Sequence, residues 1–305
     1  MATSSTLQTA IQSLSPDLYY PLTETSGTTL TNLGSVTGAN LTLTGTYTLT
    51  DRELITGDTT KFLRLNGGYA AGSRGSLTVP ITSYTVSFIV EIMPFSTILT
   101  LDPSLFSVSA SGDSLVTNAQ ILIAYNQATA TPYAFHEYDV GVNDVSYFNS
   151  TLSLNALPNG SGAKVQVTIV RDSVTKIIKY YINGYLMETQ IFANNTNGGS
   201  STTIKIGSEG DNRPSINGTM GHVCMWSRVL TEQELFTIHS ASGYTNKTAY
   251  NTLNMGIEST FASTWTDSNA YANSLRKLAD KQLAIALDPL IDKSVLDPAG
   301  AYSQI

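Results

Sequence analysis

Residues 164–170 read Lys-Val-Gln-Val-Thr-Ile-Val, and residues 176–182 read Lys-Ile-Ile-Lys-Tyr-Tyr-Ile, followed directly by Asn183-Gly184. The first segment alternates polar and apolar residues, which is the period of a β-strand with one buried face. Asn-Gly after the second segment is a strong hairpin signal. We therefore expect antiparallel strands joined by tight turns around this stretch.

The same pattern extends outward in both directions, from Leu18 to about Arg228. Short strand-like segments recur between Gly- and Asn-containing turns, at 41–44, 62–65, 84–90, 105–108, 121–125, 203–207 and 221–226. Many short strands without intervening helices are typical of sandwiches and jelly rolls. The sequence thus predicts an all-β fold, an antiparallel jelly-roll β-sandwich over residues 18–244.

Helical patterns flank the predicted sandwich. Leu7, Ile11 and Leu14 form a narrow apolar stripe that ends at Pro16, which predicts a helical arm within residues 1–17. Thr231 and Glu234 have the spacing of a capping box, so a short helix begins there. We expect residues 245–305 to form a helical appendage, whose main helix would span about 267–287, with an apolar face of Tyr271, Leu275, Ala279, Leu283 and Ala286.

Composition excludes several classes of partner. Of the 305 residues, 13% are charged, where about 25% is usual, and the formal net charge is -7. A chain so poor in Lys and Arg is unsuited to nucleic acid or to an anionic membrane surface. The single cysteine, Cys224, lies in an apolar run and is interpreted as a small buried hydrophobe.

Three stretches together resemble the laminin G-like, concanavalin A-like jelly-roll family. They are residues 18–29, which resemble the family's opening strand, residues 179–184, which resemble its Asn-Gly hairpin, and Ile206-Gly207 with residues 217–231, which resemble its closing strand and the short helix after it. The resemblance covers about 18–240 and implies two curved antiparallel sheets packed face to face. It leaves function open, since this fold hosts lectins, adhesion modules and glycan hydrolases.

Glycan hydrolysis is one function that the resemblance suggests. Jelly-roll endoglucanases carry acids at alternating positions of one strand. Glu137 and Asp139 supply the first two positions here, but Gly141 stands where the third acid belongs. We therefore expect no enzymatic activity.

A calcium site is a second implication of the resemblance. Family members often bind calcium through an acidic residue just after the closing-strand glycine, where this chain has His222 after Gly221, and Asn32 stands where an aspartate is frequent. Calcium prefers several charged oxygen ligands, so both departures weaken the site. The remaining candidates are Asp211, Asn212 and Asn217, for which a capped turn is the favoured alternative; no other cofactor is expected.

Glycan binding without hydrolysis is the third possibility. Sugar sites combine aromatic faces with hydrogen-bonding side chains. One short region gathers such residues: Tyr133, His136, Tyr138, Asn143, Asp144 and Tyr147. The alternative is that these aromatic residues pack in the core or pair across strands.

A Ser-, Thr- and Asn-rich β-protein without a basic, apolar leader at Met1 raises the question of how it reaches the outside. Phage virion proteins, some of which carry laminin G-like domains, offer an answer. We therefore hypothesise a virion surface protein, either a decoration protein, a head fibre or a tail-associated adhesin. Its partners would be capsid or tail components, further copies of itself, for example in a trimer, and host or environmental glycans. The expected docking residues are Leu7, Ile11, Tyr271, Leu275 and Leu283. The alternative is an extracellular carbohydrate-binding or adhesion module of a cell.

Overall fold

The computed structural model describes residues 2–79, 81–93, 104–109, 119–125, 134–139, 144–149, 164–191, 202–207 and 216–243. Contacts divide the chain into two units, Met1–Thr245 and Asn246–Ile305, and all described residues lie in the first. The helix predicted over 267–287 lies outside the described residues. None of the described helices is long and apolar enough to cross a membrane.

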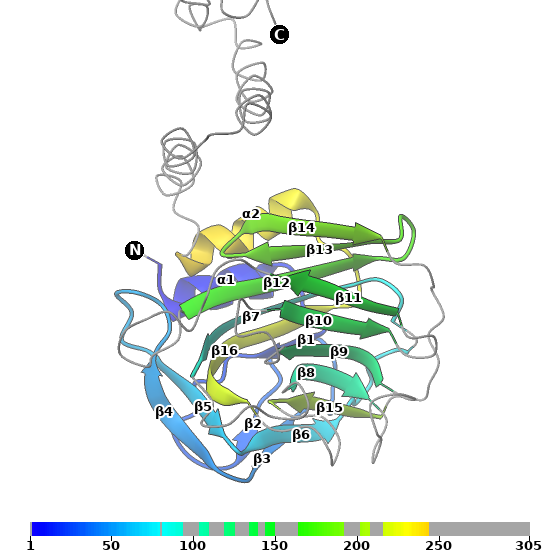
Figure 1. Cartoon of the computed structure of the whole chain (residues 1–305). Coiled ribbons are helices and arrows are strands. Elements are labelled where there is room, and N and C mark those ends of the chain that lie inside the picture. Colours follow the sequence, from blue (N-terminus) through cyan, green and yellow to red (C-terminus); the bar gives the residue numbers. More distant parts are fainter. Residues whose placement is uncertain are drawn as a thin grey trace, which may run out of the picture. The chain divides into compact units, whose positions relative to one another are not determined.

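The first of two sheets has the strand order β14-β13-β12-β7-β16-β5-β4, with β1 also paired to β16 (Figure 1). All of its pairings are antiparallel. Its strands are β1 (Leu18–Tyr20), β4 (Tyr47–Glu53), β5 (Lys61–Asn66), β7 (Tyr84–Ile92), β12 (Lys164–Asp172), β13 (Ile177–Ile182), β14 (Tyr185–Ile191) and β16 (Asn217–Trp226).

The second sheet has the order β11-β10-β9-β8-β15-β6-β3-β2 and is also antiparallel. Its strands are β2 (Thr29–Leu30), β3 (Leu41–Thr44), β6 (Tyr69–Ser73), β8 (Ser104–Ser109), β9 (Ala119–Tyr125), β10 (Ala134–Asp139), β11 (Asp144–Asn149) and β15 (Thr203–Ile206). Seven of the fourteen described pairings join strands that are not consecutive in the sequence. Two antiparallel sheets connected by such crossovers confirm the predicted jelly-roll sandwich.

The main core lies between the sheets and follows the alternation read in the sequence. Val165, Val167 and Ile169 of β12 are buried in it together with aliphatic residues of the second sheet such as Ile204 and Ile206. The hairpin signal is also confirmed, because Asn183 and Gly184 have φ values of 52° and 81°. In β7 all nine residues are buried, since helices cover the outer face of this sheet as well.

Two helices, α1 (Ser4–Ser13) and α2 (Glu232–Ser242), pack on the outer face of the first sheet (Figure 1). The capping box predicted at Thr231 and Glu234 is present. Leu7 and Ile11 are 0% and 2% exposed and belong to the core cluster beneath the helices. This corrects the expectation that they dock on a partner, because the chain's own sheet already covers both side chains.

The residues before α1 and after α2 lie next to each other. Gly243 ends α2 with a φ of 76°, and a side chain at this position would collide with Ala2. The two ends of the described chain, before α1 and after α2, therefore lie together on the helix-covered side of the sandwich.

Cys224 is 1% exposed, as expected for a buried hydrophobe, and burial raises the pKa of its thiol.

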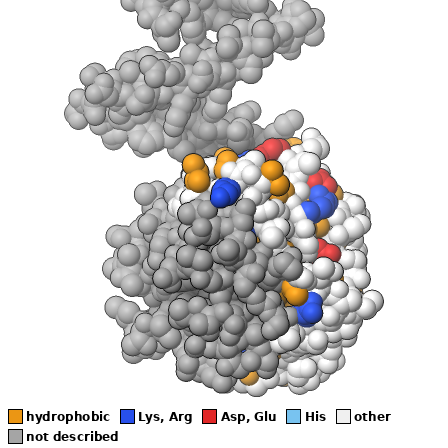
Figure 2. Space-filling model, turned by 90° about the vertical axis from the view of Figure 1, so that its right-hand side faces the viewer, with side chains coloured by type: hydrophobic (Ala, Val, Ile, Leu, Met, Phe, Trp, Pro, Cys, Tyr) orange, Lys and Arg blue, Asp and Glu red, His pale blue; other side chains and the backbone are white. Residues whose placement is uncertain are grey.

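Few charged side chains reach the surface of the described part. On the face in Figure 2 they are scattered, and most of the described surface is white, the colour of uncharged polar side chains and backbone. Isolated large apolar side chains are also exposed, among them Val174 at 89% and Ile191 at 83%.

Candidate functional site

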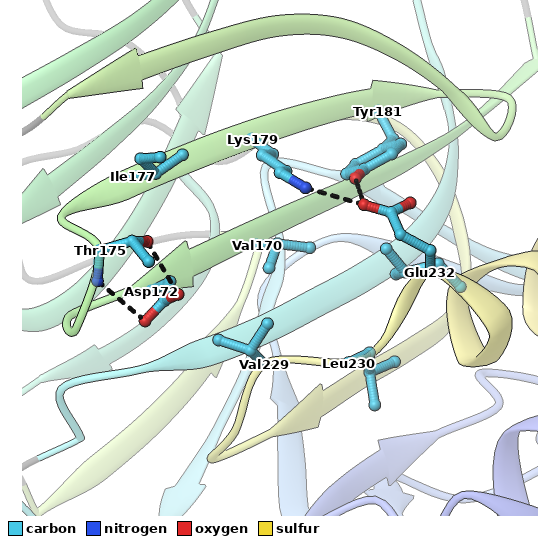
Figure 3. Close-up of a pocket in the computed structure, with 10 residues that line it drawn as sticks. Val170, Asp172, Thr175, Ile177, Lys179, Tyr181, Val229, Leu230 and Glu232 are labelled. Carbon is cyan, nitrogen blue, oxygen red and sulfur yellow. Dashed lines mark hydrogen bonds and ion pairs between the residues drawn. The ribbon is translucent and has the colours of Figure 1, made fainter.

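A pocket of about 200 Å³ opens on the outer face of the first sheet, between the β12–β13 hairpin and the start of α2 (Figure 3). The hairpin supplies residues from alternating positions of its two strands, and α2 and the connector before it supply the rest. The lining residues are Val170, Asp172, Thr175, Ile177, Lys179, Tyr181, Val229, Leu230, Glu232 and Leu235.

One wall of the pocket is a hydrogen-bonded group of three residues. Oε1 of Glu232 accepts a hydrogen bond from Nζ of Lys179 at 2.8 Å and another from the hydroxyl of Tyr181 at 3.1 Å (Figure 3). The side chain of Glu232 is 71% exposed and that of Lys179 is 35% exposed. Both therefore present polar atoms to solvent while being held in a fixed orientation.

The floor of the pocket is aliphatic and its opposite end is polar. Val170 and Leu230 are buried, and Ile177 is half-buried. At the far end, Asp172 accepts hydrogen bonds from the hydroxyl of Thr175 at 2.8 Å and from the backbone N–H of Val174 at 2.9 Å. The pocket thus combines an apolar surface with hydrogen-bonding groups on two sides.

Both carboxylates of the pocket are stabilised in the ionised form. The hydrogen bond from Lys179 lowers the pKa of Glu232 below its usual value, and the Tyr181 hydroxyl reinforces this against the opposing effect of burial. Burial alone would raise the pKa of Asp172, but the hydrogen bonds from Thr175 and the neighbouring backbone outweigh it and lower that pKa. Neither group is protonated near neutral pH.

A buried polar network holds α2 against the first sheet. Nε2 of His239 lies 3.0 Å from the hydroxyl of Thr168, which lies 2.7 Å from that of Ser87. The hydroxyl of Ser242 donates to Oε1 of Gln166 at 2.7 Å. Burial lowers the pKa of His239 to about 4, so its ring is neutral and fits this uncharged network. The network fixes the last turns of α2 on the sheet, and the capping box of Thr231 and Glu234 defines its start next to Glu232.

The predicted glycan residues fall partly on described strands. His136 and Tyr138 lie in β10, and Asp144 and Tyr147 lie in β11, at the end of the second sheet. In the strand register His136 is opposite Tyr147, whereas Asp144 is opposite Asp139. The backbone therefore brings these positions onto neighbouring strands. Tyr133 and Asn143 lie outside the described residues.

The calcium candidates do not assemble a site in the described part of the chain. Asp211 and Asn212 lie outside it, and Oδ1 of Asn217 accepts a hydrogen bond from Nη2 of Arg64 at 3.4 Å. The described residues contain no group of three or more His, Cys, Asp or Glu residues that could hold a metal ion. The docking candidates Tyr271, Leu275 and Leu283 also lie outside the described residues.

Residues at the family's usual calcium positions have structural roles here. Oδ1 of Asn32 accepts hydrogen bonds from the backbone N–H of Tyr19 at 2.7 Å and of Gly34 at 3.0 Å. His222 is 1% exposed, with the hydroxyl of Ser4 3.0 Å from Nε2 and the hydroxyl of Tyr19 2.8 Å from Nδ1. Asn32 caps a turn, and His222 joins α1 to the closing strand.

Comparison with solved structures finds binding domains of botulinum neurotoxins. That of serotype D has 15% sequence identity and a TM-score of 0.53, with 76% of this chain and 52% of that chain covered. The binding domain of neurotoxin DC, solved in complex with rat synaptotagmin II, has 17% identity and a TM-score of 0.53 over 76% and 53%. A type C structure, from a neurotoxin whose cell entry depends on interaction with two ganglioside molecules, has 16% identity and a TM-score of 0.54 over 76% and 52%.

This chain spans about half the length of those binding domains, and at such low identity the likeness shows the fold alone. No curated protein matches the chain. A family model of the laminin G type matches residues 66–236, which is more than half of the chain and runs from the end of β5 into α2. The chain therefore belongs to the concanavalin A-like lectin/glucanase superfamily.

Proposed function

We propose that this chain is a non-enzymatic carbohydrate-binding module whose ligand occupies the pocket between the β12–β13 hairpin and α2. The pocket itself carries the proposal. A pyranose ring has an apolar C–H face and a rim of hydroxyls, and the pocket offers an aliphatic floor next to oriented donors and acceptors at Lys179, Tyr181 and Glu232. Such a mixture of apolar surface with a few placed polar groups is typical of ligand sites.

The ionised state of the two carboxylates in the pocket favours binding over hydrolysis. Glycosidases need one carboxyl group that stays protonated near neutral pH to act as general acid. The pKa values of Glu232 and Asp172 are both lowered, so neither is suited to that role. Ionised carboxylates are instead good acceptors for sugar hydroxyl groups.

The structural neighbours support the proposal through their fold. The type C neurotoxin interacts with gangliosides, which are glycolipids, so a related sandwich belongs to a glycan-recognising protein. The shared region is about half of that chain, so only this chain's own residues identify the site.

A glycan array probed with the full-length chain tests the function, and titration of a bound oligosaccharide tests the site. Lys179→Met removes the ammonium while keeping most of the side-chain volume, and we expect about tenfold weaker binding from the loss of one charge-assisted hydrogen bond. Lys205→Met is the matched control, since Lys205 is also half-buried but lies in β15 of the other sheet. An array without any bound glycan would refute the function, and equal affinities of the two variants would refute the site.

A second candidate surface for the same function is the β10–β11 pair, where His136 and Tyr147 are register partners. If this pair is the site, His136→Ala and Tyr147→Ala would reduce glycan binding. If the pocket is the site, both variants would leave the affinity unchanged. Product analysis of the bound oligosaccharide tests the absence of catalysis: sugar release that Glu137→Gln abolishes would identify a hydrolase.

We further propose that the sandwich is displayed on the surface of a virion, with an extracellular module of a cell as the alternative. The adjacency of Ala2 and Gly243 supports display, because attachment on this one side leaves the remaining surface facing outward. Mass spectrometry and immunogold labelling of purified particles test this location, and absence of the chain from such particles would contradict it.

A further inference from the structure

A polar cluster lies on the outer face of the first sheet, the face to which Phe62 and Ile89 of the core beneath the helices also belong. It consists of Asp51, Arg52, Arg64, Glu91 and Thr219, contributed by β4, β5, β7 and β16. In the register Thr219 stands between Glu91 on one neighbouring strand and Arg64 on the other. Side chains at these three aligned positions share one face of the sheet. With Asp51 and Arg52 of the neighbouring β4, the cluster extends over four strands.

Arg52 and Thr219 connect the members of this cluster. Nε of Arg52 donates to Oδ2 of Asp51 at 2.8 Å, and its Nη1 donates to Oε1 of Glu91 at 3.3 Å. The hydroxyl of Thr219 donates to Oδ2 of Asp51 at 2.9 Å. Burial alone would raise the pKa of Asp51, but the hydrogen bonds from Arg52 and Thr219 together with the charges of Arg52 and Arg64 outweigh it and lower that pKa.

Two buried atoms of the cluster have no hydrogen-bond partner in the described part of the chain. One is the acceptor Oε2 of Glu91, a residue that is 2% exposed, and the other is the donor Nε of Arg64. A buried polar atom left unpaired is destabilising, so such atoms are usually satisfied by a bound ligand or by ordered water. An orphaned acceptor and an orphaned donor on either side of Thr219 suit a ligand that both donates and accepts.

The local charge favours an anion. Two arginines and Lys164, the register partner of Glu91, face two carboxylates, which gives 3 - 2 = +1 on a chain whose net charge is -7. The guanidinium of Arg64 is held only at Nη2, by the 3.4 Å contact with Asn217, among the interactions described for it. A planar guanidinium with free N–H groups binds a carboxylate through two parallel hydrogen bonds.

We propose that this cluster is a second binding site, specific for acidic sugars. The carboxylate of the sugar binds Arg64, and a hydroxyl group near that carboxylate donates to Oε2 of Glu91. Arg52 covers Glu91, and its side chain is 32% exposed, so the long arginine can turn outward to admit the ligand. The pocket beside α2 and this cluster then recognise different parts of a glycan or different glycans.

The test uses the full-length chain with sodium D-glucuronate as the probe and D-glucose as its neutral counterpart, followed by ligand-observed NMR titration. We expect glucuronate to bind at least about tenfold more tightly than glucose, because a charge-assisted bidentate contact exceeds a neutral one by that amount. Arg64→Gln should remove the difference. Equal binding of the two sugars, or no binding of either, would overturn the proposal.

Two further variants keep the result interpretable. Arg64→Lys retains the charge but not the planar fork, so affinity for glucuronate should still fall about tenfold even if Arg64→Gln does not fold. Lys205→Met removes a half-buried charge in β15, outside both sites, and should leave glucuronate binding unchanged. Undiminished binding by Arg64→Lys, or its loss in Lys205→Met, would place the acidic sugar elsewhere and refute the assignment, without bearing on neutral glycans in the pocket.

Discussion

Substitution of Leu7 by alanine tests whether α1 is an integral part of the sandwich. Leu7 is 0% exposed and belongs to the core cluster between the helices and the first sheet. A Leu→Ala change at such a site removes the transfer free energy of the lost methyl groups and leaves a cavity, which together cost about 2–5 kcal/mol. Since a domain is stable by about 5–15 kcal/mol, the loss should be a large share of the total.

Urea unfolding of the full-length chain, followed by tryptophan fluorescence, measures this effect. Trp226 is a suitable reporter because its Nε1 donates a hydrogen bond to the carbonyl of Leu14, at the end of α1, at 3.0 Å. The matched control is Gln12→Ala on the exposed side of the same helix, expected to change stability by no more than about 0.5 kcal/mol. If Leu7→Ala were as mild as Gln12→Ala, α1 would not be packed as described and could again serve as a docking arm.

Two other consequences concern the closing strand. Burial lowers the pKa of His222 from 6.5 to about 3. Between these values the unfolded chain binds the proton and the folded chain does not, so this contribution to stability is complete above pH 6.5 and falls by about 1.4 kcal/mol per pH unit below it. Unfolding of His222→Asn, which tolerates the local φ of 50°, should show a pH slope smaller by about that amount; an unchanged slope would mean that His222 is not buried and neutral. Gly221→Ala places a Cβ against the ring of Phe62, which is 0% exposed and cannot move aside, so urea unfolding should show a loss of about 1–3 kcal/mol; a neutral effect would contradict this packing.

Local patterns were sufficient to predict the sandwich. The alternation of residues 164–170 and the Asn183-Gly184 turn define β12, β13 and the hairpin to β14, and the structure has them where the pattern predicts. These signals operate within a few residues and need no knowledge of distant contacts. The surface against which α1 packs could not be predicted in this way. An apolar stripe shows that one face of a helix is buried, but it does not show which surface covers that face.

The pocket was missed for the same physical reason. Lys179 and Glu232 are 53 positions apart in sequence and meet only because α2 folds back over the first sheet. The strand pattern of residues 164–182 and the capping box at Thr231 and Glu234 located the elements on the two sides of the pocket, but no local pattern showed that these elements meet. The aromatic residues of 133–148 attracted the binding hypothesis because their clustering is visible in the sequence itself.

The central claim is that the sandwich binds an intact glycan in the pocket between the β12–β13 hairpin and α2. The most direct test is a crystal structure of the full-length chain soaked with an oligosaccharide selected on the glycan array. Our account predicts uncleaved sugar over Val170 and Leu230, hydrogen-bonded to Lys179 and Glu232. Sugar bound instead at the β10–β11 pair, or a cleaved product in either place, would contradict it.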